Sequence, residues 1–261
     1  MCTLALFSRV LPGLPLVVAA NRDEFLARPT ASPGLLSDAP QVFGGRDLVA
    51  GGTWLCVRET GLVVGVLNRR TGEPPDPSRL SRGSLCADLA CSASAADAAR
   101  SLARVPPDAH NPFNLLVADR SGAWVGQNRG DRTVVEELPP GTHLLTNLDL
   151  NDATCPRISH SSRHFVAVGE RFAADRDRPT LVAGLRETLA DHVTAVDDRQ
   201  PTDQICIHMD GYGTRSSSVV LVDDRARVAF LHADGPPCRV PHERLALPWD
   251  ESPETPPLPT P

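Results

Sequence analysis

A cysteine directly follows the first methionine, and an apolar run, "TLALF", comes after it. Because cysteine is small, we expect Met1 to be removed, which leaves a chain whose first residue has both a thiol and a free α-amine. An unperturbed α-amine has a pKa of ~8 and a thiol of ~8.5, so the amine can accept the thiol proton near neutral pH. Cys2 is therefore a candidate nucleophile with its own base. The alternative is a buried strand cysteine like the others.

The sequence "NRDE" at the end of the next apolar run supplies the polar groups that such a nucleophile requires. A cation favours the thiolate and a carboxylate orients the amine, which are the roles we expect for Arg22 and Asp23. Asn21 and Arg22 are candidates for support of the substrate or the thiolate. An ordinary surface ion pair in a turn is the alternative for Arg22 and Asp23. We assign Glu24 a structural role, as a cap or as the partner of Arg28.

Two asparagines each follow an apolar run, Asn68 in "LVVGVLN" and Asn147 in "HLLTN". Each side-chain amide could donate to the oxyanion of an acyl-transfer intermediate. Each could equally form a turn by bonding its own backbone. The residues alone leave both alternatives open.

A glycine-containing segment, "DGYGTRSSSVVLVDD", brings Arg215 to the start of an apolar strand. Gly211 and Gly213 indicate a backbone that is held close to another group. Arg215 could bind a substrate carboxylate or lower the pKa of a thiol. It could also pair with Asp210 across the turn.

The first two apolar runs are predicted to form a β-hairpin. "CTLALFS" and "LPLVVAAN" are joined by "RVLPGLP", in which Pro-Gly is a turn signal. Antiparallel pairing brings the start of the first strand towards the end of the second. Cys2 and Asp23 are therefore expected to be neighbours in space.

The rest of the chain alternates between strand-rich and helix-rich segments. We expect a Pro/Ser-rich loop at 29–40, a hairpin within 51–68, two helices within 81–104 broken near 92–94, strands at 113–119, 122–128, 132–138 and 143–147, helices at 158–174 and 179–194, and strands at 216–223 and 227–233. This order predicts an α+β fold with antiparallel sheets, and two stacked sheets between helix layers fit the number of strands. We expect one domain over 1–246 and a disordered proline-rich tail over 247–261.

Composition excludes several classes of function. The net charge of -6 and the pI of 5.7 argue against a nucleic-acid partner. All 26 basic residues are arginine, so Schiff-base lysine chemistry and a lysine-containing phosphate loop are excluded. Seven scattered cysteines without a C-x-x-C pair predict a reduced, cytoplasmic protein, and we predict no metal site. "LPLVVAA" is too short to span a membrane, so we expect no stable membrane insertion.

Seven motifs together resemble one protein family. They are Met-Cys at the start, "AANRDEF", "GGTWL", the strand that ends in Asn68, "FNLLVAD", "LLTN" and "GYGTRSSSVVLVD". In this order they are similar to the NRDE family, also called the transport and Golgi organisation protein 2 family, over residues 1 to about 232. That family is similar in turn to N-terminal nucleophile hydrolases of the choloylglycine and penicillin V acylase type. The resemblance implies an αββα four-layer sandwich.

The same resemblance implies roles for five residues. Cys2 would be nucleophile and base, and Asp23 would hold its α-amine. Asn147 and Asn68 would line the oxyanion hole, and Arg215 would sit beside the thiol.

The chain departs from the acylases in one respect. Those enzymes have an arginine three residues before the aspartate, whereas here Ala20 occupies that position and Arg22 is adjacent to Asp23. The catalytic role of an arginine therefore does not transfer to Arg22 by position.

These observations predict a hydrolase that acts on the linear amide C–N bond of a small acyl substrate and requires no cofactor. The alternative that the family implies is a non-catalytic carrier of haem or lipid that uses the same pocket. For haem binding, the candidate iron ligands are His208, which is close to Cys206, and His143, which is close to Asn147. A third alternative, an inactive relative that organises membranes through protein contacts, ranks last because no segment has the character of a membrane-binding helix.

Overall fold

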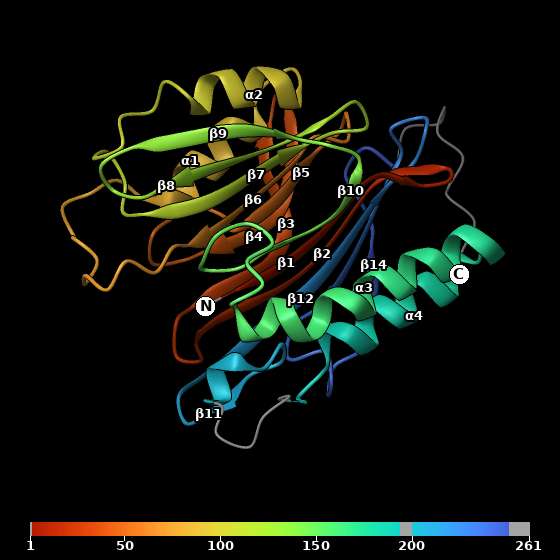
Figure 1. Cartoon of the computed structure of the whole chain (residues 1–261). Helices are drawn as coiled ribbons and strands as arrows, with labels where there is room; N and C mark the ends of the chain where they lie inside the picture. Colours follow the sequence, from red (N-terminus) through yellow and green to blue (C-terminus); the bar gives the residue numbers. More distant parts are fainter. Residues whose placement is uncertain (1, 194–199, 251–261) are drawn as a thin grey trace.

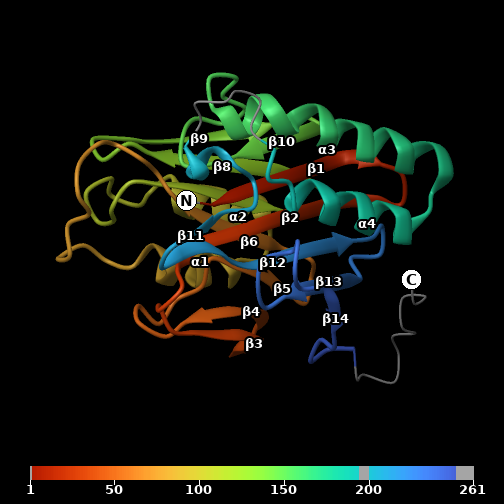
Figure 2. The ribbon, with the colours of Figure 1, turned by 90° about the horizontal axis from the view of Figure 1, so that it is seen from below.

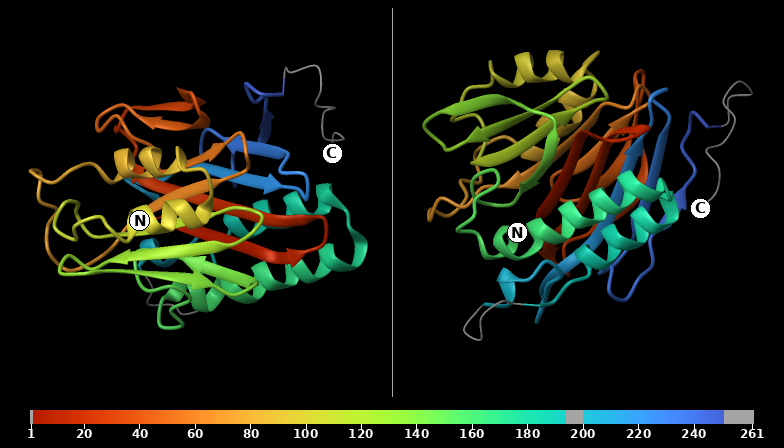
Figure 3. Two further views of the ribbon diagram at one scale, coloured as in Figure 1. Left: turned by 90° about the horizontal axis from the view of Figure 1, so that it is seen from above. Right: turned by 45° about the vertical axis from the view of Figure 1, so that its right-hand side comes forward.

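Within the residues that the computed structural model describes, 2–193 and 200–250, two antiparallel sheets of seven strands lie face to face (Figure 1). A pair of helices covers the outer side of each sheet, so the layers run helix, sheet, sheet, helix (Figure 3, right). The α+β four-layer sandwich predicted from the sequence is confirmed.

The first sheet contains both strands of the N-terminal hairpin at its centre. Its strand order is β10-β1-β2-β12-β13-β14, and β11 pairs with β12 at one end (Figure 2). The strands are β1 (Thr3–Leu11), β2 (Leu14–Phe25), β10 (Gly141–Leu145), β11 (His208–Met209), β12 (Tyr212–Val222), β13 (Val228–Ala233) and β14 (Glu243–Leu245).

The second sheet is a meander in which every strand pairs with its neighbours in sequence. Its order is β3-β4-β5-β6-β7-β8-β9. The strands are β3 (Thr30–Asp38), β4 (Gln41–Asp47), β5 (Leu55–Arg58), β6 (Val63–Asn68), β7 (Phe113–Ala118), β8 (Ala123–Asn128) and β9 (Thr133–Leu138).

Four α-helices form the outer layers of the described structure. They are α1 (Arg82–Ala90), α2 (Ala95–Leu102), α3 (Pro156–Asp175) and α4 (Arg178–Leu189), and a 3₁₀ helix, η1, covers Pro201–Asp203. Side-chain oxygens of Ser81, Ser94 and Asp177 cap the first turns of α1, α2 and α4, which explains where these helices begin. Among the described residues, no helix combines the length and the apolarity that crossing a membrane requires.

Three apolar cores hold the four layers together, and strand alternation assigns residues to them. Leu4 and Leu6 of β1 pack between the two sheets, whereas Ala5 and Phe7 pack under α3 and α4. A third core lies between the second sheet and α1 and α2. Because successive side chains of a strand point to opposite faces, even-numbered residues at the start of β1 face the second sheet. Cys2 accordingly packs against the core between the sheets.

The structure differs from the sequence-based expectation in two segments. The expected loop at 29–40 is largely a strand, β3, whose register shifts between Ala31 and Gly34. Pro33 is tolerated there because β3 is an edge strand, where a missing N–H breaks no ladder. The expected domain boundary at 246 is also too early: Leu247 is buried, and the Trp249 ring packs on Phe43 with centroids 6.4 Å apart. The rest of the predicted tail, 251–261, lies outside the described residues.

Candidate active site

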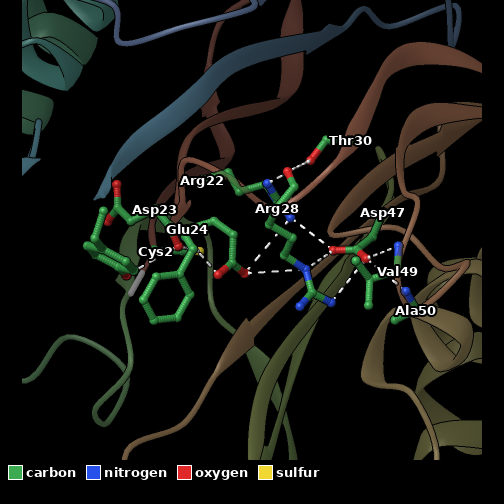
Figure 4. Close-up of polar contacts among 11 residues, drawn as sticks. Cys2, Arg22, Asp23, Glu24, Arg28, Thr30, Asp47, Val49 and Ala50 are labelled. Carbon is green, nitrogen blue, oxygen red and sulfur yellow. Dashed lines mark hydrogen bonds and ion pairs between the residues drawn. The ribbon is translucent and has the colours of Figure 1, made fainter. Parts of the chain in front are cut away.

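The first hairpin brings the candidate nucleophile and the candidate carboxylate together. β1 and β2 pair antiparallel with Thr3 opposite Asn21, as the sequence predicts, and one further step of this register puts Cys2 opposite Arg22. The Cys2 Sγ lies 3.9 Å from the backbone oxygen of Asp23. Cys2 and Asp23 are thus neighbours at one end of the first sheet (Figure 4).

Alternation along β2 sends neighbouring polar side chains to opposite faces. Asn21 and Asp23 face the helices, whereas Arg22 faces the second sheet. The Asn21 amide nitrogen donates to the backbone oxygens of Leu189, at 2.8 Å, and Ile205, at 3.0 Å. These contacts give Asn21 a structural role, joining β2 to the end of α4, in place of the substrate contact that the sequence suggested.

Asp23 lies in a fully enclosed polar pocket. Its Oδ2 accepts from Arg157 Nη1 of α3 at 3.0 Å, and its Oδ1 accepts from the Thr214 hydroxyl of β12 at 2.7 Å. Burial raises the pKa of the Asp23 carboxyl, and the charge of Arg157 opposes that rise. Both side chains of the Asp23–Arg157 ion pair are almost completely inaccessible. The carboxylate is therefore held in one position beside Cys2.

The Cys2 thiol is half-buried and has two strands as neighbours. β10 pairs with β1 with Leu4 opposite Leu145, and extension of this register places Asn147 opposite Cys2. Burial raises the pKa of the Cys2 thiol, whereas the positive charge of Arg22 lowers it. Because burial is the larger of these effects, the thiol needs a base beside it to ionise near neutral pH.

Arg22 is directed away from Asp23 and into the space between the sheets. Its guanidinium donates to Asp47 Oδ2 and to Thr30 Oγ1, at 3.0 and 3.2 Å, and lies 4.3 Å above the Trp54 ring. Arg22 and Asp23 therefore do not form the surface ion pair that the sequence left open as an alternative. Arg22 stays near the thiol as a fixed positive charge.

Asp47 binds two arginines, Arg22 within the "NRDE" sequence and Arg28 four residues after it (Figure 4). Arg28 donates to it from Nε and Nη2, at 2.6 and 3.0 Å, and also forms a longer ion pair with Glu24. Burial alone would raise the pKa of Asp47, but the hydrogen bonds from Arg28 and from the backbone lower it below its usual value. The predicted pairing of Glu24 with Arg28 is confirmed.

The two candidate asparagines lie where the ends of the two sheets meet. Asn68 ends β6, and Asn147 follows β10. The backbone N–H of Arg70 donates to the backbone oxygen of Asn147 at 2.8 Å, which joins the two segments. Asn68 is exposed, whereas Asn147 is buried. Their role as oxyanion donors stays a prediction.

A cleft of 340 Å³ opens beside Asn68. Four arginines line it, namely Arg69, Arg79, Arg82 and Arg129. Burial lowers the pKa of Arg82, and the nearby groups of Cys2 and Glu24 oppose that change, which places this guanidinium within electrostatic reach of the thiol. The acidic side chains of Glu73 and Asp76 also line the cleft, and Arg82 is the lining residue whose charge is linked to Cys2.

The glycine segment before Arg215 behaves as its sequence indicates, but the arginine itself points elsewhere. A Cβ on Gly213 would lie 2.5 Å from the Ile207 backbone oxygen, so only glycine allows this close approach. Arg215 Nη1 donates to Asp234 Oδ1 at 3.2 Å, not to Asp210. This bond turns the guanidinium towards the end of β13. The described contacts of Arg215 therefore do not join it to the Cys2 thiol, and its role beside that thiol stays a prediction.

Sequence comparison decides the family. The family model described as Transport and Golgi organisation 2 matches residues 1–234. The chain belongs to this family. It is 30% identical to the transport and Golgi organization protein 2 homolog of Bos taurus, over 82% of this chain and 84% of that protein. It is 28% identical to the Drosophila melanogaster protein of that name, over 84% and 86%.

Solved structures share the fold of this family member at low sequence identity. A Caenorhabditis elegans orthologue of N-acylethanolamine-hydrolyzing acid amidase superposes with a TM-score of 0.57 at 14% identity, covering 84% of this chain and 92% of that one. A mutant conjugated bile acid hydrolase from Clostridium perfringens superposes with a TM-score of 0.58 at 9% identity, covering 94% and 92%. These comparisons show the N-terminal nucleophile hydrolase type of fold.

Sequence reasoning missed Arg157, which is the arginine that pairs with Asp23. A signal was present in the helix pattern: Arg157 lies on the same stripe of α3 as the buried residues Ser161, Phe165 and Phe172. A charged residue on the apolar stripe of a helix needs an internal partner. The arginine that pairs with Asp23 in this family member therefore comes from α3 and not from β2.

Other candidates for holding a cofactor or a metal are His143 and two clusters of side chains that can ligate metals. His143 uses both ring nitrogens, with Pro139 O at 2.9 Å and Asn151 Nδ2 at 3.2 Å, so it is not free to bind haem iron. His160, His164 and Asp191 gather at one end of α3, where the His160–Asp191 contact is 2.8 Å. A second cluster, of two histidines and two cysteines, adjoins β11.

Proposed function

We propose that the protein is an N-terminal cysteine hydrolase that cleaves the linear amide bond of a small acyl substrate. One observation carries this proposal: a half-buried Cys2 thiol at the end of β1 lies beside Asp23, whose carboxylate is fixed by two donors. A purely structural cysteine requires no such buried ion pair next to it.

The base would be the α-amine that removal of Met1 releases on Cys2. Asp23 would hold this amine, and its strand position next to the start of β1 supports that role. The thiol requires this help, since burial raises its pKa. The fixed charge of Arg22 favours the thiolate once it forms.

The reaction would proceed through a thioester. The Cys2 thiolate adds to the amide carbonyl carbon, and the amide side chains of Asn147 and Asn68 would donate to the resulting oxyanion. The C–N bond then breaks, and the amine leaves with the proton that the α-ammonium returns to it. Water, deprotonated by the α-amine, adds to the thioester, which releases the carboxylic acid and restores the thiol.

The cleft at Asn68 suggests the class of substrate. Arg69 and Arg129 pair with Asp149, and Arg79 pairs with Asp76, so among the described residues Arg82 is the cleft arginine without a carboxylate partner. Arg82 would favour an acyl amide that has a carboxylate or another anionic group at one end. The structural relatives are described as an acid amidase for N-acylethanolamines and a hydrolase for conjugated bile acids. Both names fit hydrolysis of an amide between an acyl group and a small amine.

N-terminal mapping and a substrate panel test the proposal. Intact mass shows whether the chain starts at Cys2, and limited alkylation over a pH series shows whether Cys2 is labelled before the other six cysteines. We expect the mature chain to hydrolyse at least one member of a panel of acyl amides and Cys2→Ala to be inactive, with Cys91→Ala, at an exposed cysteine, unaffected. Full activity of Cys2→Ala towards every accepted amide would contradict the proposal.

The carrier alternative uses the same cleft without chemistry and stays a prediction, as does the cytoplasmic location. Titration with haemin tests haem binding, since a saturable Soret shift supports it. Two results together would favour the hydrolase over the carrier. They are the absence of a saturable Soret shift with haemin and the acylation of Cys2 alone by an amide substrate.

A further inference from the structure

Four side chains from three separate segments converge next to β11. His192 follows α4, Cys206 and His208 flank Ile207 at the start of β11, and Cys238 lies in the loop after β13. Their four candidate ligand atoms all lie within 4.8 Å of one another. We propose that His192, Cys206, His208 and Cys238 bind a structural zinc ion.

The distances fit the edges of a tetrahedral zinc site. Zn–S bonds of about 2.3 Å and Zn–N bonds of about 2.0 Å give tetrahedral edges of about 3.8 Å between two sulfurs and about 3.5 Å between sulfur and nitrogen. The Cys206 and Cys238 sulfurs are 3.7 Å apart. The His208 Nε2 lies 3.2 Å from the Cys238 sulfur and 3.8 Å from the Cys206 sulfur.

The orientation of His192 also fits a ligand. Its Nδ1 lies 2.9 Å from the Cys206 backbone oxygen. A metal-binding histidine commonly donates its other ring N–H to a carbonyl, which fixes the tautomer and directs the free nitrogen at the metal. Because Nδ1 is used in this way, Nε2 of His192 is the atom left for zinc.

The ligand set selects the metal and its role. Two thiolates and two imidazoles in a tetrahedral arrangement are typical of zinc, and hard cations such as magnesium prefer oxygen. Four protein ligands complete the coordination shell and leave no position for substrate, which is typical of structural and not catalytic zinc. The site is also distinct from a disulfide, since two bonded sulfurs would be about 2.05 Å apart.

The site lies one residue from the support of Asp23. Ile207, between the two ligands Cys206 and His208, donates its backbone N–H to the Thr214 hydroxyl at 2.9 Å. That hydroxyl in turn donates to Asp23 Oδ1 at 2.7 Å. Zinc would therefore join the end of α4, β11 and the loop after β13, and would fix the strand end that holds Asp23.

Sequence spacing conceals this site, which is why no metal was predicted. Only Cys206 and His208 are close together in sequence, and His192 and Cys238 are separated from them by 14 and 30 positions. The pairing of β11 with β12 and the course of the loop after β13 bring the four together. The zinc site does not depend on the proposed hydrolase activity, so a Cys2→Ala chain should retain its metal.

Metal analysis of the untagged, full-length protein tests the proposal. We expect one zinc per chain after zinc loading and desalting, and X-ray absorption at the zinc edge should show two sulfur and two nitrogen neighbours. Cobalt in place of zinc should give tetrahedral d–d bands and thiolate charge-transfer bands. The variants Cys238→Ser and His208→Ala should lose the metal, whereas Cys91→Ser and Cys2→Ala should keep it.

Metal analysis and X-ray absorption on the unaltered chain test the proposal even if a variant fails to fold. A chain that retains no zinc after loading overturns the proposal, and so does a coordination shell of oxygen and nitrogen without sulfur. Peptide mapping that finds Cys206 joined to Cys238 as a disulfide in the isolated protein also overturns it. Removal of zinc should lower the thermal midpoint of the unaltered chain and leave that of a folded Cys238→Ser chain unchanged.

Discussion

Arg157 donates to the Asp23 carboxylate at 3.0 Å, and both side chains are excluded from solvent. The same guanidinium donates to the Thr3 hydroxyl and, through Nε and Nη2, to the Thr202 backbone oxygen. One side chain of α3 thus joins β1, β2 and the segment of η1. The ion pair fixes the candidate active-site carboxylate and connects the helix layer to the first sheet.

Replacement of Arg157 should destabilise the protein strongly. Arg157→Met removes the guanidinium that pairs with the buried Asp23 carboxylate, and loss of one partner of a buried pair costs about 3–5 kcal/mol. Urea unfolding measures this change in the free energy of unfolding. The matched control is Arg171→Met on the same helix, where Arg171 is 71% exposed and pairs with Asp175. That surface pair should contribute about 0–1 kcal/mol. Equal losses for the two variants would contradict the role given to Arg157.

Loss of the Thr214 hydroxyl should lower the free energy of unfolding. This group donates to Asp23 and accepts from the Ile207 N–H, so Thr214→Val removes two buried hydrogen bonds. We expect a loss of about 1–3 kcal/mol for such a change. Thr214→Ser keeps the hydroxyl and should restore most of the stability and of any amidase activity. A valine variant as stable as the serine variant would show that the hydroxyl contributes little.

Local patterns predicted much of the fold. The first hairpin followed from two apolar runs around a Pro-Gly turn, and the break between α1 and α2 near Ser92 followed from a run of small polar residues. Each depends on residues close in sequence, where propensity and turn chemistry act directly. The neighbourhood of Cys2 and Asp23 could be predicted for the same reason.

Contacts between distant segments were not predictable from local patterns. Arg157 lies 134 positions from Asp23, and only the folded sheet and helix layers bring the two together. The direction of Arg22, towards Asp47 and not Asp23, depends on which face of β2 meets the second sheet. Strand alternation gives the two faces, but the register and layer order that assign them come from tertiary packing.

Arg82 should contribute to substrate binding if the protein is an amidase. Its guanidinium lines the cleft and donates to the Pro112 backbone oxygen, and no ion pair of Arg82 exists among residues 2–193 and 200–250. Arg82→Gln should raise the KM for an acyl amide with a terminal carboxylate by roughly tenfold, because a hydrogen bond to a charged group is worth about 1.5–3 kcal/mol. The kcat should change little.

Two controls separate binding by Arg82 from general damage. A neutral methyl ester of the same substrate should show the same KM with Arg82 and with Gln at this position. Arg100→Gln, on the exposed side of α2, should leave the KM of both substrates unaltered. A KM that rises equally for the charged and the neutral substrate would exclude charge recognition by Arg82.

Two histidines, His232 of β13, which is buried, and His242, which is half-buried, should make stability depend on pH. His232 Nδ1 lies 2.9 Å from the Ser218 hydroxyl, and His242 Nε2 lies 3.0 Å from the Ser217 hydroxyl. Burial lowers the pKa of both imidazoles to about 4. Arg215 also lowers the pKa of His232 while Asp234 raises it, and His232 lowers the pKa of His242.

The sign of the pH effect follows from proton uptake by the unfolded chain. Its histidines titrate near 6.5, so between about pH 6.5 and 4 the unfolded state binds more protons than the folded state, and the free energy of unfolding falls as the pH falls. The contribution of His232 and His242 is complete above pH 6.5, and each can lose up to roughly 3 kcal/mol by pH 4. Urea unfolding at a series of pH values measures the slope, which His242→Gln should reduce and His232→Gln with His242→Gln should reduce further. A slope that is the same in all three chains would show that these two imidazoles remain charged or exposed in the folded protein.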